Sequence, residues 1–219
     1  MIETGIRVFF AENVNCPGVA SPFGAQTRHD GSSRVGEANN GFHAGLDISS
    51  PEGTPLLAIA DGVVTEKRVG GLLAGIQIYF QHSPADTGFP VWLYSKYQHL
   101  REPSPLAVGE RVRVGQVIGY SGRTGTVGGH YGARGYPHLY LSLYVGADEA
   151  FVVGPGGALP VQGRFLDPLA IYTTGPLDNH QLKDLPGPRK LVVAPYKLAD
   201  GRTVPSDTRV VWPYLCSPW

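Results

Sequence analysis

Residues 137–145 read Pro-His-Leu-Tyr-Leu-Ser-Leu-Tyr-Val, in which leucines alternate with polar and aromatic side chains. Successive side chains of an extended strand point to opposite faces of its sheet. The three leucines therefore share one face, which we expect to pack against the core. The opposite face carries His138, Tyr140, Ser142 and Tyr144. His138 and Tyr140 are two residues apart, close enough for both to reach one ion or one substrate.

Segments that precede this stretch carry further strand signals. Residues 75–80 alternate apolar and polar side chains, and residues 91–99 are rich in the aromatic side chains that strands favour. An apolar run at residues 55–60 and a second strand-like stretch at residues 63–68 flank an Asp-Gly dipeptide. This pattern is typical of a β-hairpin, so we expect the two runs to pair with each other.

The composition favours the same class of structure. Thirty glycines, nineteen prolines and one methionine indicate many short strands joined by tight turns. Residues 8–11 are a short candidate strand, and glycines punctuate residues 108–119 as they do at the corners of barrel-like sheets. Residues 82–90 and 145–163 are expected to be loops, and residues 165–172 the only helical turn. We predict an all-β protein with a mainly antiparallel open sheet or barrel-like sandwich.

The last part of the chain differs from the rest in its proline-rich turns. We predict a main domain over residues 1–172 and a C-terminal extension over residues 173–219. Within the extension, residues 190–194 and 208–212 are apolar runs on either side of an Asp-Gly turn. These two runs are expected to form a hairpin that packs against the main domain.

Charge and hydropathy exclude several classes of function. The formal net charge is zero, so nothing indicates binding to nucleic acid or to an anionic membrane surface. No apolar run approaches the roughly 20 residues of a membrane span. The first residues lack the features of a signal peptide, so export would require another route or a leader already removed. Cys16 and Cys216 are either two unpaired buried thiols or a disulfide made in an oxidising compartment.

Two further histidines are candidates for chemistry. His43 and Asp47 are four residues apart, which on an extended strand separates their Cα atoms by roughly 13 Å. We expect Gly45 to let the backbone curl so that both side chains converge. His99 follows Tyr97 by two residues, so these two are expected to share a face. A histidine with a pKa near neutrality suits general acid–base work.

Taken in order, these pieces resemble the M23 family of zinc metallopeptidases, which includes the LytM and lysostaphin types. The resemblance extends from residue 21 to about residue 172 and is specific because the pieces occur together and in sequence. They are Ser21-Pro-Phe-Gly24, Phe42-His43-Ala-Gly-Leu-Asp47, Gly53-Thr-Pro, Ala60-Asp-Gly-Val-Val, Tyr97-Gln-His99-Leu, Val114-Gly-Gln-Val-Ile-Gly-Tyr-Ser-Gly122, Pro137-His138-Leu and Asp167-Pro-Leu.

The resemblance implies a duplicated-hybrid-motif fold with an open groove, located outside the cytoplasm. It implies zinc as cofactor and the peptides of bacterial peptidoglycan as ligand. His43 and Asp47 match two of the three zinc ligands of the family. His99 and His138 match histidines that assist the catalytic water or the oxyanion. The third ligand is a histidine in the family, and here Tyr140 occupies its position.

A tyrosine at position 140 leaves two hypotheses about the activity of the protein. Neutral imidazole binds zinc directly, whereas a phenol must first lose a proton whose reference pKa is near 10, at a cost of about 4 kcal/mol at pH 7. In the first hypothesis the domain is degenerate: it binds peptidoglycan or a cell-wall enzyme and has weak or lost endopeptidase activity. In the second, Tyr140 or another group such as His130 completes the site and the protein cleaves peptidoglycan cross-links. The lysine that a lipoyl-type carrier needs at a hairpin tip is not evident.

Overall fold

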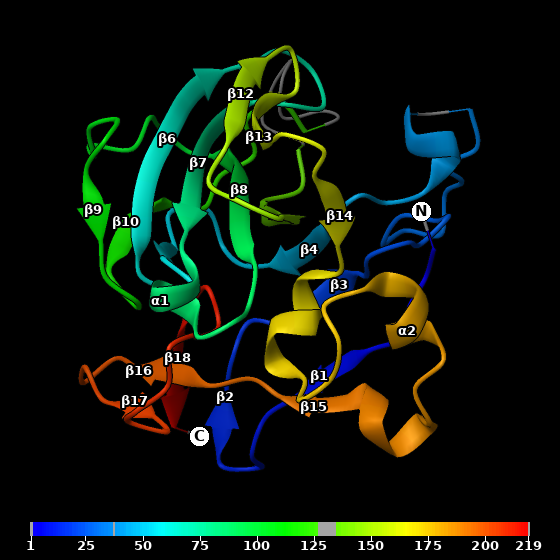
Figure 1. Ribbon diagram of the computed structural model, residues 1–219, viewed down its shortest axis with the longest axis vertical. Coiled ribbons are helices and arrows are strands. Elements are labelled where there is room, and N and C mark those ends of the chain that lie inside the picture. The colour runs from blue at the N-terminus through cyan, green and yellow to red at the C-terminus, as the bar shows by residue number, and fades with distance from the viewer. Residues whose placement is uncertain (1, 37, 127–134, 219) are drawn as a thin grey trace.

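An eight-stranded antiparallel sheet dominates the fold (Figure 1). The computed structural model describes residues 2–36, 38–126 and 135–218. The strand order is β3-β4-β11-β8-β7-β6-β9, and β14 pairs with the later half of β11. These strands are β3 (Val19–Ser21), β4 (Leu46–Ser49), β6 (Gly62–Val69), β7 (Ile76–His82), β8 (Trp92–Leu100), β9 (Arg111–Val112), β11 (His138–Gly146) and β14 (Arg164–Leu166).

Smaller sheets and short helices complete the structure. The strand β5 (Pro55–Leu57) pairs with β10 (Val117–Tyr120), and β12 (Phe151–Gly154) pairs with β13 (Gly157–Pro160). A parallel pair joins β1 (Arg7–Phe9) to β15 (Leu191–Val193). A four-stranded sheet contains β17 (Thr203–Val204), β16 (Tyr196–Leu198), β18 (Leu215–Pro218) and β2 (Val14–Asn15). The helices are α1 (Pro84–Thr87), α2 (Asn179–Lys183) and the 3-10 turns η1 (Ala38–Gly41), η2 (Pro168–Tyr172) and η3 (Gly187–Lys190).

The predicted all-β, mainly antiparallel class is confirmed, and the sheet is open. The alternation along β11 sends Leu139, Leu141 and Leu143 into the core, where each is at most 1% exposed. The Tyr97 hydroxyl fixes the large sheet to the β5 layer beneath it. It donates a hydrogen bond to the carbonyl of Leu57 and accepts one from the amide of Ile59, both at 2.9 Å.

The predicted hairpin of residues 55–60 and 63–68 is wrong. The strand β5 pairs with β10, whereas β6 pairs with β7 and β9. The side chain of Asp61 accepts a hydrogen bond from the amide of Val114 at 2.6 Å, and its carbonyl lies 2.7 Å from Nδ1 of His82. These contacts hold the Asp-Gly dipeptide in a crossover between two layers, not in a tight turn.

The predicted loops at residues 82–90 and 145–163 are also wrong. The first contains α1, which begins with a capping box between Ser83 and Asp86 and has Pro84 at its first position. A serine, a proline and an acidic residue in this spacing are a helix-start signal that is readable in the sequence. The second contains the hairpin β12–β13. The helical turn expected at residues 165–172 is present as η2 but is accompanied by other short helices.

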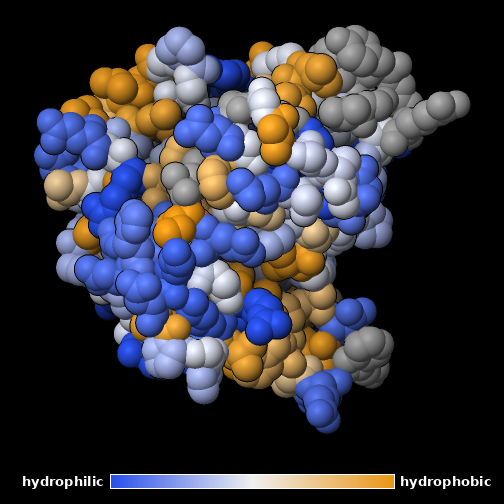
Figure 2. Space-filling model, turned by 90° about the vertical axis from the view of Figure 1, so that its right-hand side faces the viewer, coloured by the Kyte–Doolittle hydropathy of each residue, from blue (hydrophilic) through white to orange (hydrophobic). Residues whose placement is uncertain are grey.

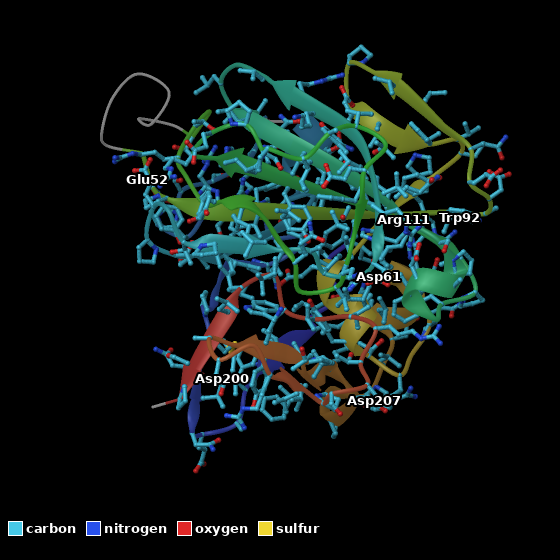
Figure 3. All side chains as sticks on the ribbon, turned by 90° about the vertical axis from the view of Figure 1, so that its left-hand side faces the viewer. Glu52, Asp61, Trp92, Arg111, Asp200 and Asp207 are labelled. Carbon is cyan, nitrogen blue, oxygen red and sulfur yellow. A yellow bond between two sulfur atoms is a disulfide. The ribbon has the colours of Figure 1, made fainter. Side chains whose placement is uncertain are left out.

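Residues 173–219 contain a hairpin, but with other strands than predicted. The Asp-Gly turn at residues 200–201 joins β16 to β17. The first predicted partner, residues 190–194, contains β15, which pairs with β1. The second predicted partner, residues 208–212, forms no strand, and its Trp212 is fully buried. Figure 3 shows Asp200 and Asp207 in this lower layer, apart from Glu52 and Trp92 in the region of the large sheet.

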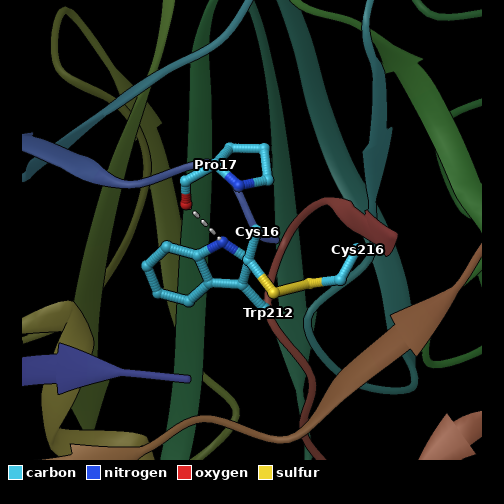
Figure 4. The surroundings of a disulfide bond; sticks show 4 residues. All are labelled: Cys16, Pro17, Trp212 and Cys216. Carbon is cyan, nitrogen blue, oxygen red and sulfur yellow. Dashed lines mark hydrogen bonds between the residues drawn. A yellow bond between two sulfur atoms is a disulfide. The ribbon is translucent and has the colours of Figure 1, made fainter. Parts of the chain in front are cut away.

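A disulfide between Cys16 and Cys216 settles the question that the sequence left open. It joins the segment after β2 to β18, across 200 residues of sequence. Figure 4 shows the bond beside Trp212, whose indole N–H donates a hydrogen bond of 3.0 Å to the carbonyl of Pro17. The tail therefore shares one core with the N-terminal segment and the sheet region.

The surface is mixed in character. On the face in Figure 2, hydrophilic and hydrophobic residues are interspersed, with apolar side chains gathered along the upper edge and in the lower part. Within the described residues, no helix is long and apolar enough to cross a membrane.

Asp167 provides a pH-dependent contribution to stability. It is buried, caps η2 and accepts a hydrogen bond from the Thr4 hydroxyl. Burial raises its pKa from 3.8 to about 6. Between these two pH values the carboxyl is ionised in the unfolded chain and still protonated in the folded one. The free energy of unfolding therefore falls as pH rises, by about 3 kcal/mol in total once pH exceeds 6.

Asparagine at this position keeps the cap and does not titrate. We expect the free energy of unfolding of Asp167→Asn, relative to the unaltered protein, to increase by about 3 kcal/mol between pH 4 and pH 7. Urea titrations at a series of pH values measure it, with the exposed Asp207→Asn as control for loss of a carboxylate. A difference that does not change with pH would contradict the assignment.

Candidate metal centre

Three neighbouring strands bring the predicted site residues together. The strand β11 lies between β4 and β8, and its Tyr140 is directly opposite Asp47 on one side and Gln98 on the other. His138 lies one pair further along, opposite Ser49. Directly opposed residues of adjacent strands project from the same face of a sheet. The register therefore puts Asp47, Tyr140 and His138 on the face opposite the core leucines.

His99 reaches this face through a bulge in β8. Gln77 pairs with Gln98 and Ile76 pairs with Leu100, which leaves His99 without a partner on β7. Its φ of 67° lies in the left-handed region, which residues other than glycine rarely occupy. The expectation that His99 shares a face with Tyr97 is therefore wrong. The extra residue turns the His99 side chain toward the site face, whereas Tyr97 stays in the core. The ring centroids of His99 and His138 are 4.7 Å apart.

The convergence of His43 and Asp47 is present, although its cause differs from the one predicted. Nε2 of His43 lies 3.2 Å from Oδ1 of Asp47. Gly45 has no left-handed φ, so it is not a point of curling. A Cβ at this position would lie 2.7 Å from the carbonyl oxygen of Leu141 and 2.7 Å from Cζ of Tyr140. Glycine is required here because β11 and the Tyr140 ring approach the backbone closely.

The three histidines present the same nitrogen to the centre. Nδ1 lies within hydrogen-bond distance of a backbone carbonyl in each ring: 3.0 Å from Pro22 for His43, 2.7 Å from Thr124 for His99 and 2.9 Å from Tyr136 for His138. A carbonyl only accepts, so Nδ1 carries the proton. Nε2 is then the nitrogen left to face the centre, which is how second-layer contacts orient metal-binding histidines.

Asp47 is the electrostatic centre of the site. Its buried Oδ1 makes no hydrogen bond, although Nε2 of His43 and Nε2 of His138 lie 3.2 and 3.5 Å away. Burial would raise the pKa of Asp47, but His43, which donates to the carboxylate when it is protonated, and the positive charges of protonated His138 and of Arg34 lower it below its usual value. A carboxylate oxygen that faces imidazole lone pairs favours a proton or a cation between them.

Sequence reasoning did not identify Arg34, which contributes a positive charge to the site. One of its guanidinium nitrogens lies 3.5 Å from Oδ2 of Asp47 and 3.3 Å from the Ser21 hydroxyl. The residue lies in a segment rich in turn residues, and no pattern relates it to Asp47. Its position follows from the backbone hydrogen bond of 2.9 Å between its amide and the carbonyl of Gln26.

Burial keeps Tyr140 a neutral phenol. It raises the pKa of Tyr140 well above the usual value, against the opposing effect of the Ser142 hydroxyl. The Tyr140 ring is edge-on to His43, with centroids 5.3 Å apart, and 6.1 Å from His99. The ammonium of Lys96 lies 5.2 Å from the centre of the same ring, within the range of a cation–π interaction.

The residues present fit two ligands of a metal ion and not three. His43 Nε2 and Asp47 Oδ1 are separated as two ligands of one tetrahedral zinc would be, and the unsatisfied Oδ1 favours a cation. Tyr140 is a protonated phenol where the third ligand is expected. Within the described part of the chain, no three His, Cys, Asp or Glu side chains are grouped to hold a metal ion. His130 lies outside the described residues.

A cluster of histidines around a buried aspartate, on one face of an antiparallel sheet, is the kind of site that metal-dependent hydrolases use. Residues 41–151, half of the chain, match the model of Peptidase family M23. The chain belongs to this family.

Several known proteins are similar to this chain. It is 38% identical over 103 residues to the peptidoglycan DD-endopeptidase ShyC of Vibrio cholerae, a match that covers 47% of this chain and 20% of that protein. It is 41% identical over 98 residues to the DD-carboxypeptidase/endopeptidase Mpg of Neisseria meningitidis, covering 42% and 20%. The chain thus spans about a fifth of the length of these relatives. The catalytic domain of lysostaphin from Staphylococcus simulans shares 24% identity, with a TM-score of 0.43 over 72% of this chain and 89% of that one.

Proposed function

We propose that this domain binds the peptides of bacterial peptidoglycan and that its zinc-dependent endopeptidase activity is weak or lost. The single observation that carries the proposal is the tyrosine at position 140, which lies opposite Asp47 and beside His43 where the resemblance places the third ligand and whose pKa is raised by burial. Membership of Peptidase family M23 supports the substrate class, because relatives of this chain are named peptidoglycan endopeptidases.

The roles of individual residues follow from the same proposal. His43 and Asp47 are the two retained ligand positions, and His99 and His138 are the positions that would move protons in an active member. Burial, followed by the nearby His138, lowers the pKa of His99 to about 3, so this ring is neutral at physiological pH. In this proposal the site face of β4, β11 and β8 forms the floor of a peptide-binding groove in the predicted main domain, residues 1–172, and the protein acts outside the cytoplasm.

Binding and cleavage can be tested separately. We expect the purified protein to co-sediment with isolated peptidoglycan sacculi in the presence of a chelator, because binding depends on the groove and not on a metal. We expect no release of new amino termini above the level of His99→Ala. Chelator-sensitive release that disappears in His99→Ala would instead establish an active peptidase. Failure to co-sediment would contradict peptidoglycan binding.

A binding domain of this kind has a second partner class. A cell-wall enzyme that acts on the bound peptides would be the natural partner of a member that does not cleave them. Co-sedimentation of the protein with sacculi in the absence of any other protein separates direct binding from recruitment by such an enzyme.

A further inference from the structure

Within residues 2–36, 38–126 and 135–218, the cation of Lys96 has no acidic partner. Lys96 projects from β8 on the site face, directly opposite Ser142 of β11 and Tyr79 of β7. It is half-buried. Its one contact of a polar or ionic kind among the described residues is the Tyr140 ring, 5.2 Å from its ammonium. A positive charge that is partly removed from water without a counter-ion is costly, so this position favours an anion.

An acid, Glu66, lies on the same sheet one strand beyond Tyr79 and pairs with Arg68 through Oε1, while its buried Oε2 makes no hydrogen bond. Glu66 of β6 accepts from Nε of Arg68 at 2.9 Å and from its Nη2 at 2.6 Å. Arg68 also donates to the carbonyls of Gly154 and Pro155, both at 2.7 Å. The Arg68–Glu66 pair is neutral as a unit and is held in place by the β12–β13 hairpin. It therefore leaves the charge of Lys96 uncompensated.

The Tyr140 ring links this cation to the histidine cluster. Lys96 lies over the ring, and the rings of His43 and His99 approach the same ring at 5.3 and 6.1 Å. A ligand that lies against Tyr140 would therefore meet the ammonium at one end and the imidazoles at the other. The next side chains on this face of β11 carry no charge that would repel an anion: the Ser142 hydroxyl donates to the carbonyl of Ala44, and Tyr144 is buried.

We propose that Lys96 and Tyr140 form a subsite for a carboxylate of the bound peptide. This inference rests on the proposed function, because it assumes that a peptidoglycan peptide occupies the site face. The carboxylate forms an ion pair with the Lys96 ammonium, and the adjoining part of the peptide lies across the Tyr140 ring toward His43 and His99. Two sources offer this group: the carboxyl terminus of a stem peptide and the α-carboxylate of a γ-linked D-glutamate within it.

Three synthetic peptides distinguish the sources. The first is Nα,Nε-diacetyl-L-lysyl-D-alanyl-D-alanine with a free terminal carboxylate, and the second is its terminal amide. The third is the same amide extended at its amino end by L-alanyl-γ-D-glutamate, which has only the internal carboxylate. Dissociation constants are measured by calorimetry at pH 7 for the unaltered protein and for three variants. These are Lys96→Met, Lys96→Arg and the control Lys67→Met, which removes a lysine that donates to the carbonyl of Ser104 and makes no contact with Tyr140.

We expect at least one carboxylate-bearing peptide to bind about tenfold or more tightly than the plain amide. The difference should disappear in Lys96→Met and persist in Lys96→Arg and Lys67→Met. Tighter binding of the first peptide identifies the terminal carboxylate, and tighter binding of the third identifies the internal one. Thermal unfolding of each variant verifies that it is folded.

Other outcomes overturn the inference. If all three peptides bind alike, the carboxylate subsite is wrong while peptide binding stands. If the difference survives in Lys96→Met, the carboxylate is recognised elsewhere. If none of the peptides binds although the protein co-sediments with sacculi, the subsite is wrong and the proposed function stands. Loss of both kinds of binding contradicts the proposed function as well.

Discussion

We expect the Tyr140→His variant to hold about one zinc ion per chain and the unaltered protein to retain clearly less. In the unaltered protein, ionising the Tyr140 phenol costs about 4 kcal/mol at pH 7 from its reference pKa alone. Burial raises that pKa further. An imidazole avoids this cost, so we expect zinc to bind about 10³-fold more tightly to the variant. Metal analysis after dialysis, and competition with a chromophoric chelator, measure occupancy and affinity.

The geometry of the strands supports this expectation. Position 140 lies directly opposite Asp47, so its side chain already projects over the carboxylate and over Gly45. Histidine is shorter than tyrosine and relieves the close approach to Gly45. Tyr144→His is the matched control, because it places a histidine on the same face of β11 opposite Tyr94 and not opposite Asp47. The control should not gain zinc.

Two results would contradict the prediction. Tight, stoichiometric zinc in the unaltered protein would mean that Tyr140 or another residue completes the site. Absence of zinc from a folded Tyr140→His variant would mean that Asp47 is not available to a metal, for which its ion pair with Arg34 is the structural reason. The double variant with Arg34→Gln would then restore binding.

Loss of the Cys16–Cys216 disulfide is expected to have the largest effect on stability. Because the bond closes a loop across 200 residues of sequence, the chain-entropy model assigns it about 5 kcal/mol. Removal of native disulfides typically costs about 2–5 kcal/mol. For a chain of this size we therefore expect the melting temperature of Cys16→Ser/Cys216→Ser to fall by roughly 10 °C.

Urea denaturation of the oxidised and the reduced protein provides a second measurement of the same effect. Chemical reduction leaves every side chain in place, so it avoids the cost of placing serine at the buried position of Cys216. Reductant should destabilise the unaltered protein and leave the double variant unchanged. A decrease in the free energy of unfolding of less than about 1 kcal/mol on reduction would contradict the prediction.

The sequence predicts the centre of the fold better than its periphery. The alternation along β11 correctly places the leucines in the core and Tyr140 on the site face, because side-chain direction in a strand depends only on local geometry. Pairing between strands depends on residues far apart in the chain. The hairpin expected around Asp61 is absent because the contacts of that residue with Val114 and His82 lie outside the local pattern.

The candidate site is likewise only partly predictable from the local sequence. The convergence of His43 and Asp47 is predicted, but from a curl at Gly45 that the structure does not contain. The rotation of His99 is not predicted, because it depends on one unpaired residue in the register of β7 and β8. Arg34 and Lys96 belong to no recognisable motif. Each is significant only through a neighbour that the fold supplies, Asp47 for one and the Tyr140 ring for the other.

The pairing of β2 with β18 has a consequence for the order in which the protein is assembled. These strands are hydrogen-bonded neighbours, yet β2 precedes the large sheet in the chain and β18 follows it, so β2 is synthesised well before its partner. The same holds for β1 and β15. The large sheet draws on residues between them and can form during synthesis, whereas the lower layer must wait for the tail. Long-range pairing of this kind is slow, and until it is complete the apolar face under Trp212 is exposed to chaperones and to other nascent chains.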